Sequence, residues 1–143
     1  MAAPREKKPA ATVPEVSLIV RVDMGGHGRL GPGKMLLLEN IDSFGSISAA
    51  GREMNMSYRQ AWDLVNQLNR AFVEPVVESH AGGKSGGGAS LTPLGKALVA
   101  HYRAITEATR KAASRDVAAI MAQLRPVEPM DERELVSGIR TGC

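Results

Sequence analysis

The sequence has one cysteine in 143 residues, and it is the last residue, Cys143. A single thiol cannot form an internal disulfide, so we expect a fold without covalent cross-links and assign no role to this thiol. Three histidines, His27, His80 and His101, lie far apart and lack the spacing of metal ligands. The sequence therefore indicates no metal site and no bound cofactor.

Long apolar runs are also missing. A stretch such as residues 35–38 is far shorter than the roughly 20 residues that cross a bilayer. The N-terminus is basic, but Pro9 and Pro14 follow where a signal peptide needs an apolar segment. No nucleophile–base pair suggests catalysis, so we expect a non-enzyme. A cytoplasmic location without a membrane partner is the default expectation.

The chain is mildly basic, with a formal net charge of +3 at pH 7, and its charge is unevenly distributed. Residues 82–115 contain six Lys or Arg side chains and a single acid, Glu107. Residues 116–143 contain three basic and five acidic side chains. A positive middle followed by a negative end is typical of a core that binds a polyanion.

Periodicity predicts the elements of the chain. Alternating apolar side chains predict a strand over residues 16–24. Apolar residues at steps of three and four predict the helices. The predicted helices span residues 32–44, 46–55, 57–73 and 92 to about 124, and strands at 76–80 and 90–92 flank a glycine-rich tip at 81–89.

Short hydroxyl side chains are predicted to cap three of these helices, because they accept hydrogen bonds from the first free backbone N–H groups. These caps are Ser46, Ser57 and Thr92. Gly45 is predicted to end the first helix, and the small residues 49–51 should let another helix pack closely. The buried stripe of the first helix is predicted to comprise Leu36, Leu37, Ile41 and Phe44, and that of the third Ala61, Leu64, Val65, Leu68 and Phe72.

This order of elements is mainly α with a small β-hairpin, the layout of a winged helix-turn-helix with a long C-terminal dimerisation helix. In that fold the third helix enters the major groove of double-stranded DNA, where base edges present distinguishable donors and acceptors. Short polar groups, Arg, Asn and Gln suit this role. The candidate DNA-binding residues are Ser57, Tyr58, Arg59, Gln60, Asn66, Gln67 and Arg70, with Ser46 and Ser48 at the start of the helix-turn-helix.

Some of these side chains have a second interpretation. Gln60, Asn66 and Gln67 either reach bases or phosphates, or are simply exposed. Trp62 is expected to pack between the helix and the hairpin rather than to contact DNA.

The hairpin tip, or wing, is the second candidate contact with DNA. Gly83, Lys84 and Ser85 are predicted to approach the phosphate backbone, since glycine permits a close approach and lysine supplies a charge. A nucleotide-binding P-loop is excluded here, because its first glycine would have to stand where the chain has Glu78.

The last predicted helix is long for so small a core. About 30 residues would extend ~45 Å, so part of its apolar face needs another chain. The sequence therefore predicts a homodimer with a roughly palindromic DNA site. The predicted dimer contacts are Leu94, Leu98, His101, Tyr102 and Ile105.

Two segments carry a family resemblance. The run GSISAAGREMNMSYRQAWDLVNQLN at residues 45–69 resembles the DNA-binding domain of the ModE family of molybdate-responsive transcription regulators. So does GGKSGGGASLTPLGKALVAHY at residues 82–102. The resemblance implies sequence-specific DNA binding and the regulation of genes for molybdate uptake or molybdoenzymes.

The resemblance also has a limit. Full-length ModE regulators bind molybdate in C-terminal domains, and we expect this chain to lack them. Three modes of regulation therefore stay open. They are constitutive action, the use of a separate molybdate sensor, and weak oxyanion binding by backbone N–H groups of the wing. The expected division is a disordered tail (1–15), a DNA-binding domain (16–91), a dimerisation helix (92–125) and a flexible tail (126–143).

One alternative from another functional class is a protein–protein adaptor. In that interpretation the long helix binds a partner, and the winged domain is a scaffold without specific DNA binding.

Overall fold

The computed structural model describes residues 16–83 and 86–126. The predictions for Lys84, Ser85, Cys143 and both tails concern residues outside this range, apart from Pro126. The chain divides into one unit of residues 18–113 and another of residues 1–17 and 114–143. The core and the candidate site both belong to the unit of residues 18–113.

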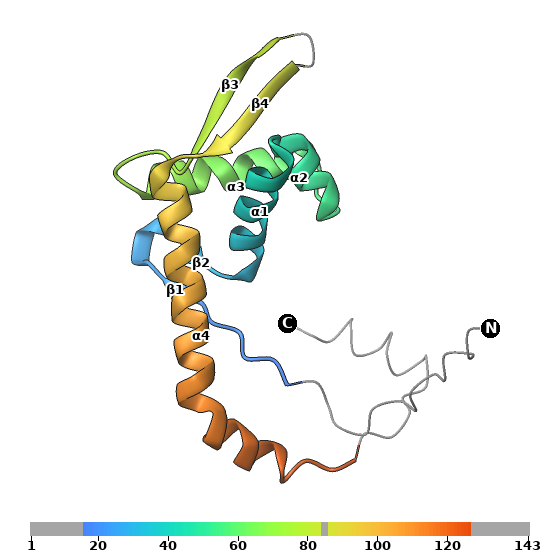
Figure 1. Cartoon of the computed structure of the whole chain (residues 1–143), viewed down its shortest axis with the longest axis vertical. Coiled ribbons are helices and arrows are strands. Elements are labelled where there is room, and N and C mark those ends of the chain that lie inside the picture. The colour runs from blue at the N-terminus through green and yellow to red at the C-terminus, as the bar shows by residue number, and fades with distance from the viewer. Residues whose placement is uncertain (1–15, 84–85, 127–143) are drawn as a thin grey trace, which may run out of the picture. The chain divides into compact units, whose positions relative to one another are not determined.

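Three helices form the centre of this unit. They are α1 (Pro32–Phe44), α2 (Ile47–Glu53) and α3 (Tyr58–Ala71). They lie together at the base of the hairpin formed by β3 (Val77–Gly83) and β4 (Gly86–Leu91) (Figure 1). Their inward faces make one hydrophobic core. Its fully buried large side chains are Leu37, Leu38, Ile41, Val65, Leu68 and Val76. The mainly α winged-helix fold expected from the sequence is thereby confirmed.

The bounds predicted for α1 are confirmed, but half of its predicted buried stripe is wrong. Gly45 ends the helix in the left-handed region, with φ of 68°, as glycine readily does. Leu36 and Phe44 are 48% and 51% exposed, whereas Met35 and Leu38 are buried. The sequence offers two overlapping apolar faces on this helix, and packing against its neighbours selected the one containing Met35 and Leu38.

α2 and α3 pack very closely. Ser46 caps α2 by accepting a hydrogen bond from the Ala49 N–H at 3.1 Å. A Cβ added to Gly51 would lie 2.9 Å from the Cβ of Ala61, so no larger residue fits at position 51. The prediction that small residues allow a close helix contact is confirmed, although α2 ends two residues earlier than predicted.

The buried stripe predicted for α3 is also confirmed. Ala61, Val65 and Leu68 are buried, and Leu64 and Phe72 are partly buried against the core. The helix itself ends at Ala71, two residues before the predicted end.

The hairpin consists of β3 (Val77–Gly83) and β4 (Gly86–Leu91), paired antiparallel. Val77 pairs with Leu91 near its base, and the register shifts between His80 and Gly83. The prediction that the whole stretch 81–89 forms a tip is therefore wrong. Backbone pairing needs no side chains, so glycines flanking residues 84–85 continue the ladder.

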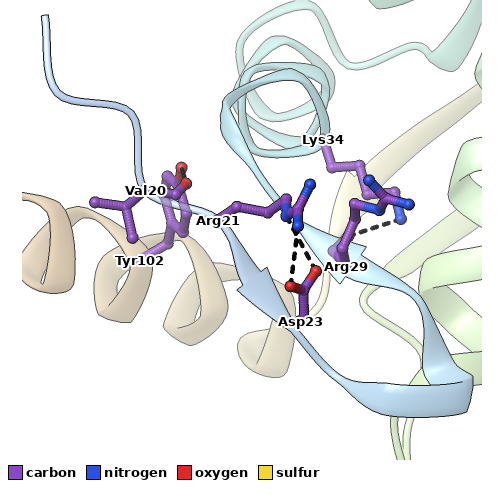
Figure 2. A network of polar contacts seen from close by, with 6 residues as sticks. All are labelled: Val20, Arg21, Asp23, Arg29, Lys34 and Tyr102. Atoms are coloured by element: carbon purple, nitrogen blue, oxygen red, sulfur yellow. Dashed lines mark hydrogen bonds and ion pairs between the residues drawn. The ribbon is translucent and has the colours of Figure 1, made fainter.

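The predicted strand at residues 16–24 is mostly absent. Only β1 (Val22–Asp23) pairs, with β2 (Arg29–Leu30), and the short 3₁₀ helix η1 (Gly25–His27) connects them. A strand needs a partner along its length, and β2 offers only two residues. The segment before β1 is fastened in another way, because the Tyr102 hydroxyl donates to the Val20 carbonyl at 2.6 Å (Figure 2).

The long helix α4 (Pro93–Met121) starts as predicted and ends three residues earlier than predicted. Thr92 caps it, since its hydroxyl accepts from the Gly95 N–H at 3.0 Å and donates to the Pro75 carbonyl at 2.7 Å. Among the described residues, no helix is long and apolar enough to cross a membrane.

Candidate nucleic-acid interface

A reciprocal capping box fixes the start of α3. The Gln60 N–H donates to the Ser57 hydroxyl at 3.1 Å, and the Ser57 N–H donates to the Gln60 side-chain oxygen at 2.9 Å. This arrangement holds the next side chains, Tyr58 and Arg59, at the exposed first turn. It also engages the Gln60 oxygen locally, whereas the amide nitrogen of the same side chain takes no part in the capping box.

One face of α3 is polar and exposed along the whole helix. Residues of an α-helix are 100° apart, so Arg59, Asn66 and Arg70 fall within a narrow arc of its surface. All three are exposed. Asp63 and Gln67 lie next to this arc on one side, and the buried residues lie on the opposite face of the helix. The face carries two guanidinium groups, one carboxylate and two amides.

An amide brace holds α3 against the hairpin. The Asn69 side-chain oxygen accepts from the backbone N–H groups of Val76 at 2.8 Å and Val77 at 3.1 Å. Its amide nitrogen donates to the Val77 carbonyl at 3.2 Å. These three bonds fix the direction in which β3 leaves α3. The sequence analysis missed this residue.

The second strand of the hairpin is fastened to the end of α1. The Ala89 N–H donates to the Gly45 carbonyl at 2.9 Å. A Cβ on Gly88 would lie 3.1 Å from the same oxygen. Across the same part of the hairpin, the His80 ring lies 2.7 Å from the Ser90 hydroxyl. The base of the wing is therefore rigidly attached to the three-helix core.

A hollow of about 210 Å³ lies where α2, α3 and the hairpin meet. Tyr58 and Trp62 form one wall, with their rings 6.1 Å apart and nearly perpendicular. Trp62 is partly buried against the core and also lines this hollow, opposite residues of the hairpin. The other walls include Ser46, Ser48, Ser79, His80 and the backbone at residues 87–89.

Most of the predicted DNA-binding residues are exposed in the structure. All seven candidates on α3 and at its cap are exposed, and Ser46 and Ser48 line the hollow beside Tyr58. Gly83 ends β3, and Lys84 and Ser85 follow it beyond the described residues.

The predicted dimer residues behave differently from one another. Leu94 and Leu98 are partly buried against the core of their own chain. Tyr102 is only 7% exposed, since it belongs to the core, and its hydroxyl donates to the Val20 carbonyl. His101 and Ile105 are exposed, Ile105 by 44%. The free apolar surface of α4 therefore begins beyond its contact with the core.

Within the described part of the chain, no group of three or more His, Cys, Asp or Glu side chains is placed to hold a metal ion. An exposed ion pair on α4 has shifted pKa values. Hydrogen bonding from Arg110 lowers the pKa of Glu107, and the same bond raises the pKa of Arg110.

No family model matches the chain. It is 48% identical over 83 residues to the molybdenum-pterin-binding protein MopB of Rhodobacter capsulatus, a match of 58% of this chain and 31% of that protein. It is 43% identical over 72 residues to the molybdenum transport protein ModE of Azotobacter vinelandii, covering 50% and 27%. It is 38% identical over 81 residues to the DNA-binding transcriptional dual regulator ModE of Escherichia coli, covering 57% and 31%. The chain thus spans about a third of the length of these relatives.

Proposed function

The chain carries a ModE-family domain, and on this premise we propose that it is a sequence-specific DNA-binding transcriptional regulator. The observation that carries the proposal is the exposed polar face of α3, which starts at Arg59. The residue before it, Tyr58, lines the hollow shared with the hairpin. A helix fits the major groove of B-DNA, which is about 12 Å wide. The capping box and the Asn69 brace hold this face in a fixed direction relative to the wing.

We assign two kinds of contact to this surface. Tyr58 and Arg59, at the first turn of α3, read base edges, because an arginine can bond to both acceptors of a guanine. The hairpin contacts the phosphate backbone through Gly83, Lys84 and Ser85. The first contact gives sequence preference, and the second gives affinity for any DNA.

We further propose that two copies of the chain act together. His101 and Ile105 are exposed on α4, and Ala108 and Ala112 continue the same helical face. Pairing of these faces would bring two α3 helices to successive major grooves, so the operator would be roughly palindromic.

The names of the relatives suggest the genes that are controlled. They include a molybdenum transport protein and molybdenum-pterin-binding proteins. We propose that the operators lie upstream of genes for molybdate uptake or for molybdoenzymes.

The test begins with selection of a preferred sequence from random duplexes by the purified chain. Affinity for that duplex and for random DNA is then measured by fluorescence anisotropy at several salt concentrations. The proposal expects a salt-resistant preference for the selected duplex. Arg59→Ala should lower affinity for the selected duplex by about 1–3 kcal/mol and affinity for random DNA by much less.

Arg115→Ala is the matched control, since it removes the same charge from an exposed position on α4. Equal losses on both duplexes for Arg59→Ala would contradict a base-reading role. Absence of any selected sequence would reject the proposal in favour of an adaptor that binds protein through α4.

A further inference from the structure

A second hollow lies at the other end of α3. It has a volume of about 290 Å³ and is lined by Gly26, His27 and Gly28 from the connection between β1 and β2, and by Gln67, Arg70 and Ala71 from α3. No acidic side chain lines it. Arginine, imidazole and amide side chains all donate hydrogen bonds, so the lining can offer several donors to one ligand.

Two further basic groups lie near Gly28, one of the residues that line the hollow. Arg29 follows Gly28 directly and is exposed. The Lys34 amino group donates to the Arg29 carbonyl at 2.8 Å (Figure 2), and it lies 3.6 Å from where a Cβ of Gly28 would stand. The nearest acid on the exposed face of α3 is Asp63, seven residues or about 10 Å along the helix from Arg70. Asp23, the cross-strand partner of Arg29, is the acid of this hairpin, and its carboxylate is paired with Arg21 at 3.1 Å (Figure 2). With that pair cancelled, Arg29, Lys34 and Arg70 leave the surroundings of the hollow positive.

The glycines leave the hollow accessible. Nothing lies within 4 Å of the position of a Cβ on Gly26. A ligand can therefore approach the backbone at this residue without meeting a side chain. Glycine in this position allows a bulky anion to reach the donors on α3.

We propose that this hollow binds a phosphate oxyanion, held chiefly by Arg70 and His27. Planar guanidinium groups recognise phosphate through paired hydrogen bonds, which are stronger than neutral ones. The oxyanion is either a DNA backbone phosphate or a free inorganic one. The first of these sources rests on the proposed function, and the second does not.

The position suits a backbone phosphate. Arg70 lies eleven residues after Arg59, about 16 Å along the helix axis. That distance exceeds the width of the major groove, about 12 Å. With the first turn of α3 at the base edges, its last turn would reach the flanking strand.

The test uses a pair of substitutions of nearly equal size. Gly26→Asp places a carboxylate at the hollow, and Gly26→Asn places a neutral amide in the same open space. Binding of random DNA by each variant is measured as a function of salt concentration. In a separate arm, ¹H–¹⁵N spectra follow the titration of each variant with inorganic phosphate at constant ionic strength and without DNA.

For a backbone phosphate, Gly26→Asp lowers DNA affinity about tenfold and the salt slope by about one, whereas Gly26→Asn does neither. For a free oxyanion, inorganic phosphate shifts the signals of Gly26, Gln67 and Arg70 in the parent chain and in Gly26→Asn but not in Gly26→Asp. The proposal is overturned if the two substitutions behave alike in both arms. Failure of the parent chain to bind DNA would reject the proposed function. The phosphate titration would still show whether the hollow binds a free oxyanion.

Discussion

The α-carbon of Gly95 lies so close to the carbonyl group of Val76 that a Cβ there would be 2.1 Å from the oxygen. The same oxygen accepts a hydrogen bond from the Thr92 N–H at 3.0 Å. The first turn of α4 is therefore pressed against the chain just before β3. Only a residue without a side chain permits this approach.

Gly95→Ala should destabilise the fold. Alanine is the better helix former, but its methyl group meets backbone that cannot rotate away, and such overpacking typically costs about 1–3 kcal/mol. Urea denaturation followed by circular dichroism measures the change in the free energy of unfolding. Gly33→Ala in α1 is the control, because open space surrounds its Cβ position. It should stabilise the chain by about 0.4–1 kcal/mol. Equal effects of the two substitutions would show that the Val76 contact is unimportant.

Asn69→Ala should also destabilise the fold, by about 1–3 kcal/mol. The substitution leaves the N–H groups of Val76 and Val77 without their side-chain acceptor. Asn66→Ala, on the exposed face of the same helix, should change the free energy of unfolding by less than about 0.5 kcal/mol. The prediction fails if the two alanine variants unfold at the same urea concentration.

Ile105→Glu should weaken self-association at least tenfold, because an unpaired carboxylate is costly to bury in an apolar interface. Sedimentation equilibrium over a range of concentrations gives the dissociation constant. Glu107→Gln lies on the other side of α4 and should leave the constant unchanged. A parent chain that is monomeric at all concentrations would contradict the proposed dimer.

The Glu107–Arg110 ion pair predicts that the contribution of this part of α4 to stability depends on pH. The Glu107 carboxylate accepts from Arg110 at 2.6 Å, and this hydrogen bond lowers the pKa of Glu107 below its usual 4.5. A carboxyl group with a lowered pKa contributes to stability above its ordinary pKa, and this contribution is lost as pH falls through the lowered value. Carboxyl ¹³C titration should show the Glu107 pKa rising towards 4.5 in Arg110→Gln. An unchanged titration curve would mean that the pair does not persist in solution.

Reasoning from the sequence went furthest where the governing contacts are local. The caps at Ser46, Ser57 and Thr92 each bond within three residues along the chain, so the residue types and their spacing suffice to predict the helix starts. The exposed face of α3 follows in the same way, since the apolar stripe on one side leaves Arg59 and Arg70 on the other.

Other features depend on which element lies alongside. The sequence could not decide that Leu38 rather than Leu36 enters the core, because both belong to apolar faces of α1 and only the neighbouring elements choose between them. It predicted too long a strand before residue 25, because alternation carries no information about a pairing partner. The Asn69 brace and the hollow at Arg70 were not predicted, since each joins groups that meet only after the chain has folded.

The sequence by itself thus determined the order of the helices, their starts and the polar face of α3, because hydrogen bonds and periodicity within a few residues encode them. Tertiary structure alone decided which side of α1 is buried, how the hairpin is held and where basic groups gather around open space. These features arise from the packing of separate elements against one another, and that packing has no local signature in the chain.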